Sequence, residues 1–233
     1  IKQYYPKPGW VEHDPLELIE KIKKIISRIT KQYSAKNILS IGITNQRETV
    51  VVWNKKNKKP IYNAIVWQCR RTKAYCDTIK IHNKKIFQKT GLYIDSYFSA
   101  TKIKWIFDNV RIPEKYLDNN DICIGTIDSW IIWNLTNGKS HVTDYTNASR
   151  TMLFNINDKK WDKELLSIFN IKENALPIVK NSMDDFGTTQ INNIQIPIQG
   201  VAGDQQSALF GQGCVTEGTS KCTYGTGLFY LLN

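Results

Sequence analysis

The chain has 233 residues, enough for one sizeable core or for one domain and part of another. Hydrophobic residues make up 41% and charged residues 23%, as in an ordinary folded protein, and no apolar run approaches the ~20 residues that cross a bilayer. A net charge of +11 is common in proteins that bind nucleic acid, but the lysines of this chain are scattered along the sequence. We therefore expect no nucleic-acid partner. The positive charge should instead attract an anionic substrate such as a nucleotide.

The first third of the chain predicts a helix followed by strands. Asp14 can cap a helix, Pro15 suits its first position, and isoleucines then recur at helical spacing as far as Tyr33. Three strands are expected next, at residues 37–44, 49–53 and 61–67. The second and third are separated by a polar turn, which predicts a hairpin.

Strands and helices alternate through the rest of the chain, which predicts an α/β class. Helices are expected at 72–80, 100–109, 127–135 and after Asp204, and strands at 121–126 and 198–202, with a strand–glycine turn–strand over 219–232. Because the last strands are followed by no helix, we expect two units: residues 1–213 as one domain and 214–233 as the first strands of another.

Five scattered cysteines form no metal-type spacing with the three histidines, so we expect no metal site made of these side chains. The odd number suits a reducing compartment, and we expect a cytoplasmic protein. The start at Ile1 has neither an initiator methionine nor a hydrophobic signal core, which predicts a beginning inside a longer protein.

Three short motifs lie at the ends of predicted buried strands, where open α/β sheets place ligands. Arg47 and Glu48 can donate to and accept from neighbouring hydroxyls of a small polyol, although a solvated turn with an ion pair explains the same residues. Trp67 can form an apolar wall or belong to the core. Asp204 can accept a hydroxyl proton during phosphoryl transfer, or simply cap a helix.

The last motif is Gly225-Thr226-Gly227, near the end of the chain. Its glycines would let the backbone approach phosphate oxygens, and the threonine hydroxyl could donate to them. A hairpin turn could carry the same three residues, so this motif alone does not specify phosphate binding.

Taken in order, these segments resemble glycerol kinases, a family of carbohydrate kinases with the two-domain, actin-like, ribonuclease-H-like fold. The resemblance spans essentially the whole chain and rests on PGWVEHDP (8–15), NQRETVVVW (45–53), YNAIVWQCRRT (62–72), YFSATKIKW (97–105), GTIDSWIIWNLT (125–136), TDYTNASRTMLFNI (143–156), GVAGDQQSALFGQ (200–212) and TYGTGLFYLLN (223–233). It implies an N-terminal kinase domain that is truncated at both ends, without the family's first phosphate-binding strands.

The resemblance also assigns roles to residues of this chain. Asp204 would be the general base that deprotonates the terminal hydroxyl of glycerol. The glycerol-binding residues would be Arg47, Glu48, Tyr97, Asp204 and Gln205, with Trp67 and Phe229 packed against the carbon backbone, and Gly225 and Thr226 would contact ATP phosphates.

The implied reaction is phosphorylation of glycerol to sn-glycerol 3-phosphate with ATP and Mg²⁺, in glycerol catabolism and glycerolipid precursor supply. The family commonly forms dimers or higher assemblies, so a homo-oligomer is expected. Residues 1–233 alone would not turn over ATP. Two alternatives stay open: another polyol or ketose kinase of the same superfamily, and a catalytically silent glycerol-binding fragment.

Overall fold

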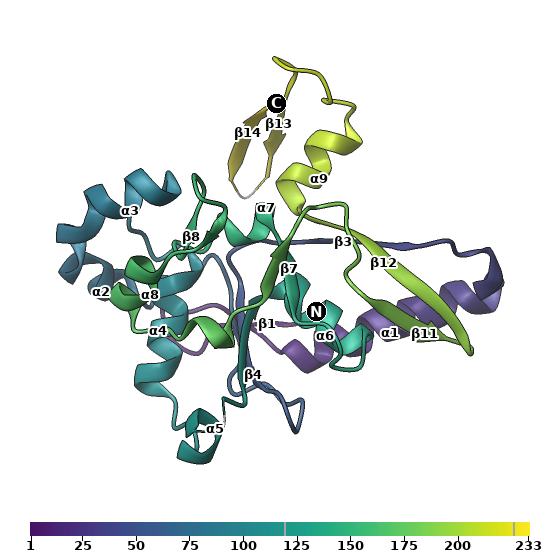
Figure 1. Ribbon diagram of the computed structural model, residues 1–233, viewed down its shortest axis with the longest axis horizontal. Coiled ribbons are helices and arrows are strands. Elements are labelled where there is room, and N and C mark those ends of the chain that lie inside the picture. Colours follow the sequence, from purple (N-terminus) through teal and green to yellow (C-terminus); the bar gives the residue numbers. More distant parts are fainter. Residues whose placement is uncertain (119, 226) are drawn as a thin grey trace.

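The computed structural model describes residues 1–118, 120–225 and 227–233 and has the predicted α/β class, with helices around several small sheets (Figure 1). The helices are α1 (Pro15–Gln32), α2 (Lys73–Thr78), α3 (Asn83–Thr90), α4 (Ser99–Asn109), α5 (Glu114–Asp118), α6 (Ile127–Leu135), α7 (Tyr145–Ala148), α8 (Lys163–Phe169) and α9 (Asp204–Gly211), with 3₁₀ turns at Ala35–Asn37, Lys80–His82 and Glu173–Ala175. No helix in the described ranges is both long and apolar enough to span a membrane.

The largest sheet has the strand order β1-β2-β5-β4-β6 and is antiparallel throughout. Its strands are β1 (Gln3–Tyr4), β2 (Glu12–His13), β4 (Val50–Asn54), β5 (Ala64–Ile65) and β6 (Ile122–Thr126). All residues of β4 and β6 are buried, and the two strands pair over their full length from Val50↔Thr126 to Asn54↔Ile122. Helices therefore pack on both faces of this pair.

A second sheet has the order β11-β12-β3 and leads directly to the candidate site. Its strands are β3 (Ile41–Asn45), β11 (Thr188–Ile191) and β12 (Ile194–Gly203). Because β12 runs parallel to β3 with Gly203 opposite Asn45, both strands end at the same edge of the sheet.

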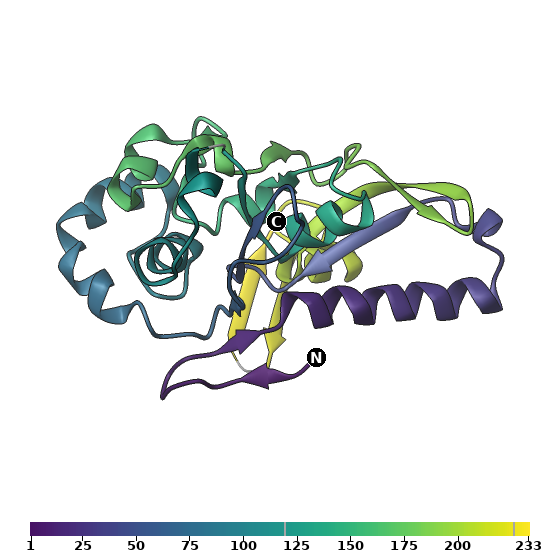
Figure 2. The same cartoon turned by 90° about the horizontal axis from the view of Figure 1, so that it is seen from below.

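Three two-stranded pairs complete the structure: β7 (Val142–Asp144) with β10 (Ile178–Lys180), β8 (Phe154–Asn155) with β9 (Lys160–Trp161), and β13 (Ser220–Tyr224) with β14 (Leu228–Leu232). The β13–β14 hairpin and α9 stand together at one end of the molecule (Figure 1). Helix α1 runs along one side and carries β1 and β2 at its N-terminal end (Figure 2).

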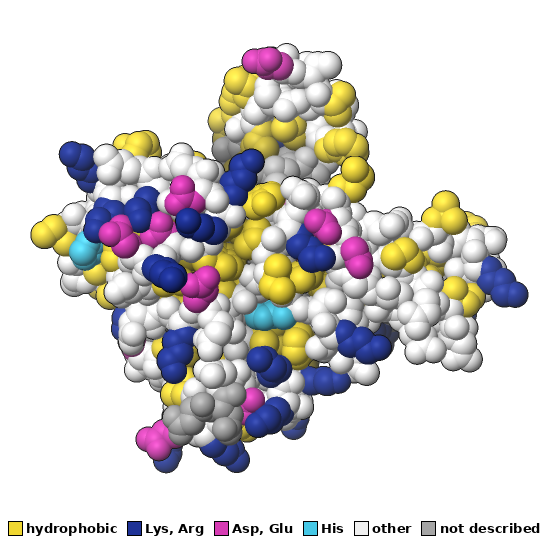
Figure 3. All heavy atoms as spheres, in the orientation of Figure 1, with side chains coloured by type: hydrophobic (Ala, Val, Ile, Leu, Met, Phe, Trp, Pro, Cys, Tyr) yellow, Lys and Arg dark blue, Asp and Glu magenta, His cyan; other side chains and the backbone are white. Residues whose placement is uncertain are grey.

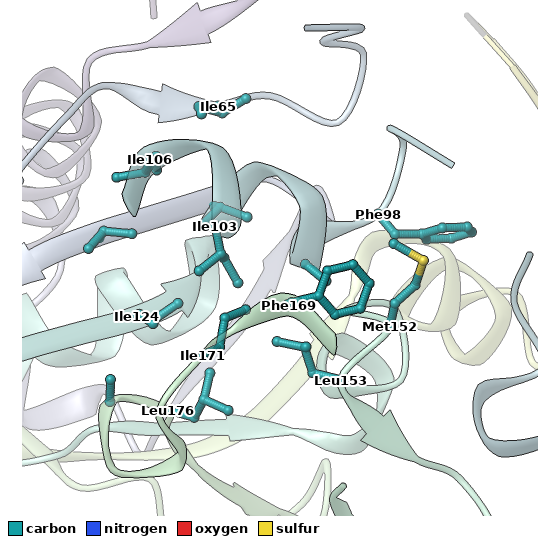
Figure 4. Packing of buried hydrophobic residues seen from close by; sticks show 14 of the residues in the cluster. Ile65, Phe98, Ile103, Ile106, Ile124, Met152, Leu153, Phe169, Ile171 and Leu176 are labelled. Atoms are coloured by element: carbon teal, nitrogen blue, oxygen red, sulfur yellow. The ribbon is translucent and has the colours of Figure 1, made fainter. Parts of the chain in front are cut away.

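Two apolar clusters hold these elements together. The larger joins one side of the main sheet to α4 and α8, and Figure 4 shows Ile103 and Ile106 of α4 in the same cluster as Ile124 of β6 and Ile65 of β5. The smaller, on the other side, is centred on Trp53 and Trp130 and includes Ile19 of α1. Trp130 also donates its indole N–H to the carbonyl of Pro15, 2.9 Å away, so α1 is fixed to α6.

Most predicted elements are present. Asp14 caps α1 by accepting from the amide of Leu16 at 2.8 Å. The strand predicted at 37–44 starts only at Ile41, after a 3₁₀ turn, and the strand at 61–67 shrinks to Ala64–Ile65 although its hairpin with β4 forms. The prediction missed the helices α3, α5, α7 and α8 and the short strands β1, β2 and β7 to β11.

Candidate active site

A strained turn after β3 presents Arg47 and Glu48. Glu48 has a φ of +60°, and the Thr49 amide donates to the Arg47 carbonyl at 2.7 Å, which closes a tight three-residue turn. For a residue with a Cβ atom, a positive φ costs about 1–3 kcal/mol. The Ser99 hydroxyl donates to the Glu48 carbonyl at 3.2 Å and fastens the turn to the start of α4.

The Glu48 carboxylate is buried, with 1% of the residue exposed, and has a partner that the sequence analysis missed. Arg150 Nε donates to Glu48 Oε1 at 2.7 Å, and the Arg150 guanidinium lies over the rings of Phe98 at 4.9 Å and Tyr97 at 5.7 Å. Burial raises the pKa of Glu48, while Arg150 and then Arg47 oppose that rise. The turn is thus not a solvated ion pair.

Arg47 lies across the end of β12. It is 6% exposed; its Nε lies 3.5 Å from Asp204 Oδ1 and its Nη1 donates to Gln206 Oε1 at 3.3 Å. Among the described residues its buried Nε has no hydrogen-bond partner. A Cβ on Gly203 would lie 2.6 Å from Arg47 Cγ, so the absence of a side chain there makes room for the arginine. Within the described ranges, Arg47 Nε is therefore an unsatisfied donor beside the Asp204 carboxylate.

Asp204 is the first residue of α9, directly after the edge where β12 and β3 end together. The alternative that Asp204 merely caps the helix is wrong, because Gly203 holds the N-cap position. Asp204 Oδ1 accepts from the Gln205 amide at 2.8 Å, and the side chain is 45% exposed. The carboxylate therefore faces both Arg47 and solvent.

Aromatic side chains form the rest of the wall. The rings of Trp67 and Tyr97 meet edge to face with centroids 5.6 Å apart. Burial, followed by the charge of Glu48, raises the pKa of Tyr97, so its hydroxyl keeps its proton. Phe229, on β14, packs against Gly227, where a Cβ would lie 2.8 Å from the ring. Aromatic rings thus line the same pocket as the charged groups.

These side chains enclose one small cavity of about 40 Å³, compared with the roughly 10–15 Å³ that one water requires. Its lining consists of Gln46, Arg47, Glu48, Trp67, Tyr97, Asp204, Gln205 and Phe229. All seven residues expected to bind substrate therefore line it. Gly225 lies outside this lining, in the β13–β14 turn, and Thr226 falls outside the residues that the structure describes.

A lysine links the hairpin to this pocket, and the sequence analysis missed it. Lys221 of β13 is 4% exposed, and its ammonium donates to Gln205 Oε1 and, at 2.6 Å, to Thr223 Oγ1. The alternating strand pattern gives no sign that this lysine points inward. Lys221 fixes the side chain of Gln205 and ties β13 to α9.

Asp144 is a third missed residue and is fully buried. Its Oδ2 accepts from the Thr146 hydroxyl at 2.7 Å, and that hydroxyl oxygen accepts from the Gly203 amide at 2.7 Å. Its Oδ1 accepts from Asn147 Nδ2 at 2.8 Å, and Asn147 bonds Asn45. One carboxylate therefore braces the ends of both β12 and β3, next to Asp204 and Arg47.

Residues 1–211 match the profile of the FGGY family of carbohydrate kinases, N-terminal domain. The chain belongs to this family, and its fold is the actin-like, ribonuclease-H-like fold of carbohydrate kinases, as predicted. The small polar pocket between the strand ends and α9 lies within the matched region, apart from Phe229.

Among curated relatives, the chain is 56% identical to a glycerol kinase of Caldanaerobacter subterraneus over 100% of its own length, and to a glycerol kinase of Clostridium botulinum over 99%. It covers 48% of each, so it spans about half the length of these relatives.

Among solved structures, the Plasmodium falciparum glycerol kinase with ADP superposes with a TM-score of 0.93 at 43% identity, over all of this chain and 48% of that one. A xylulose kinase from Lactobacillus acidophilus reaches a TM-score of 0.82 at 21% identity over 97% of this chain and 46% of that one, which shows the shared fold alone.

Proposed function

We propose that the protein is an ATP-dependent glycerol kinase that forms sn-glycerol 3-phosphate. The pocket carries this proposal: its size suits a small polyol, and its lining combines a buried arginine–glutamate pair with aromatic ring faces and a carboxylate. The 56% identity to curated glycerol kinases and the superposition on a glycerol kinase with ADP support it.

In the proposed mechanism the chain positions glycerol and accepts a proton. Arg47 Nε and Glu48 carboxylate oxygens bind neighbouring hydroxyls, and the Trp67 and Phe229 rings pack against the carbon chain. Asp204 accepts the proton of the terminal hydroxyl while that hydroxyl oxygen forms a bond to the γ-phosphorus of ATP. The bond from this phosphorus to the β–γ bridging oxygen breaks, and ADP leaves with that oxygen. Such positioning supplies most of the catalysis that phosphoryl transfer needs from a protein.

Tyr97 and Gln205 complete the proposed glycerol site. The Tyr97 hydroxyl, kept protonated by its buried setting, donates to a glycerol oxygen. Gln205 lies beside Asp204 with its side-chain oxygen held by Lys221, so its amide nitrogen remains free to donate toward the substrate.

We propose that ATP phosphates approach from the β13–β14 turn, where Gly225 and Thr226 contact them. Mg²⁺ commonly binds through one or two carboxylates and substrate phosphates, and it would neutralise charge on the transferred group. Within the described ranges no group of three or more metal-binding side chains exists. Asp204, which is half exposed beside the pocket, is the residue whose carboxylate could reach a nucleotide-bound Mg²⁺.

The remaining parts of the proposal concern the whole protein. We propose that residues 1–213 form the carbohydrate-binding domain and that 214–233 begin the ATP-binding domain. The five cysteines, all within the described residues, are free thiols, as suits a cytoplasmic enzyme. We also propose a homo-oligomer, because members of the family that the sequence resembles commonly form dimers or higher assemblies.

A competition assay tests the substrate. The protein at its full natural length receives ATP with equimolar glycerol, xylulose and ribulose, and phosphorylated products are separated and counted. The proposal predicts glycerol 3-phosphate as the dominant product. A pentulose phosphate in excess would assign another kinase of the superfamily, and glycerol binding without ATP consumption would leave a silent binding protein.

A further inference from the structure

Lys102 is an unusual buried cation beneath the pocket. It lies in the first turn of α4 with 0% of its surface exposed. Its ammonium reaches back and donates to the carbonyl of Tyr97 and, at 3.0 Å, to that of Phe98. Within the described residues it forms no ion pair.

This position is unfavourable for a positive charge. The N-terminus of a helix already carries a partial positive charge, and burial of an ammonium is costly without a counter-ion. Burial lowers the pKa of Lys102 to about 7, although Glu48, Cys69, Asp95 and Cys76 act in the opposite direction. A methionine would fill the same space without this cost, so packing alone does not account for a lysine here.

The two carbonyls that Lys102 holds belong to Tyr97, which lines the proposed glycerol pocket, and to its neighbour Phe98. The Tyr97 ring lines the cavity and meets Trp67 edge to face. The Phe98 ring lies under the Arg150 guanidinium, which in turn donates to Glu48. One ammonium thus fixes the backbone from which both an aromatic wall and the support of Glu48 extend.

We propose that Lys102 is a positioning residue of the glycerol site, holding the Tyr97–Phe98 backbone so that Tyr97 and the Arg150–Glu48 pair keep the geometry that binds glycerol. This inference rests on the proposed function. Lys102 acts through these residues and touches no substrate, because it is fully buried and is not among the residues that line the cavity.

The test compares Lys102→Met with Lys104→Met in the full-length protein. Lys104 lies on the same helix, is partly exposed and, among the residues that the structure describes, bonds only Asp108, at 2.5 Å, so its variant controls for loss of charge from α4. Lys102→Met is expected to raise the KM for glycerol about tenfold, equivalent to about 1.4 kcal/mol, with the KM for ATP unchanged. Lys104→Met should leave both constants as in wild type.

Three outcomes decide the inference. A lower melting temperature with unchanged KM for glycerol would show a purely structural lysine and overturn it. If Lys102→Met does not fold, Lys102→Gln, which keeps a shorter donor, should show a smaller rise in KM, and no rise would overturn the inference. Calorimetry measures the affinity for glycerol without requiring kinase activity. If the wild type binds glycerol but does not phosphorylate it, the proposed function is refuted, and the loss of affinity in Lys102→Met still tests the inference.

Discussion

At the scale of single residues, Arg47 occupies the space that a side chain at Gly203 would fill. Gly203→Ala places a Cβ 2.6 Å from Arg47 Cγ, so we expect the Arg47 side chain to shift. The KM for glycerol should then rise by about tenfold or more, because a hydrogen bond from a charged group is weakened. Gly211→Ala is the control, since its Cβ would meet nothing within 4 Å. Equal glycerol KM values for the two variants would contradict the role of Arg47.

In the proposed site, the buried Glu48 carboxylate should make glycerol binding sensitive to pH. Burial raises its pKa, and Arg150 limits that rise by keeping the carboxylate charged. Glycerol affinity should therefore fall as pH drops through the pKa of Glu48. In Arg150→Met the pKa of Glu48 rises further, so the fall should begin at higher pH.

Calorimetric titration of glycerol from pH 5 to 8 measures this shift. Arg150→Lys, which keeps the charge without the planar stack on Phe98, should lie between wild type and Arg150→Met. Superimposable pH profiles for all three proteins would contradict the link from Arg150 to Glu48.

Residue-scale prediction from sequence had a clear limit. Arg47, Glu48 and Asp204 were predictable because they directly follow strands whose ends meet at one sheet edge. Arg150 and Asp144 were not, because each lies in a polar, turn-rich stretch. Arg150 acts on Glu48, which is distant in the sequence, and Asp144 reaches Gly203 through Thr146. No spacing rule reports such contacts.

At the scale of elements, Asp162 joins α8 to α3. It caps α8 by accepting from the amides of Glu164 at 3.0 Å and Leu165 at 3.1 Å, and it accepts from Lys89 Nζ of α3 at 2.7 Å. Burial would raise the pKa of Asp162, but Lys89 and the amide bonds outweigh it, and the pKa is lowered.

Asp162→Ala should reduce the free energy of unfolding at pH 7 by about 1 kcal/mol or more, the value of an N-cap. A lowered folded-state pKa means that this stabilisation is present above the unfolded-state pKa and is lost as pH falls through the folded-state value. Urea unfolding at pH 7 and pH 3 should therefore show a smaller difference at pH 3. Asp77→Ala, at a surface pair with Lys80, should change stability by less than about 0.5 kcal/mol.

Elements with local signals were predicted well, and those without them were missed. Helix α1 has a capping aspartate, a proline at its start and a regular isoleucine stripe. The β11–β12 hairpin turns instead through Asn192 and Asn193, both with positive φ, without the glycine that usually marks such a turn. The strand expected at 37–44 begins late because Ser34 caps a 3₁₀ turn before it.

At the scale of the whole molecule, the net charge of +11 should affect nucleotide capture more than glycerol binding. Figure 3 shows lysines and arginines interspersed with acidic residues on the face drawn, without one continuous basic stripe. Salt screens exposed charges, and the screening length is about 10 Å at 0.1 M ionic strength. Raising the salt concentration from 0.05 to 0.5 M should therefore increase the KM for ATP severalfold. The KM for uncharged glycerol should stay constant, and parallel changes in both would contradict this account.

The measurement that tests the central claim most directly is ATP-dependent phosphorylation of glycerol by the full-length wild type and by Asp204→Asn. Asparagine keeps the size of the side chain but cannot accept the hydroxyl proton as a carboxylate does. The account predicts sn-glycerol 3-phosphate from the wild type and a kcat at least about 100-fold lower in the variant, in line with loss of a general base. Wild-type turnover that survives in Asp204→Asn would contradict the assigned base, and absence of phosphorylated glycerol from the wild type would contradict the function itself.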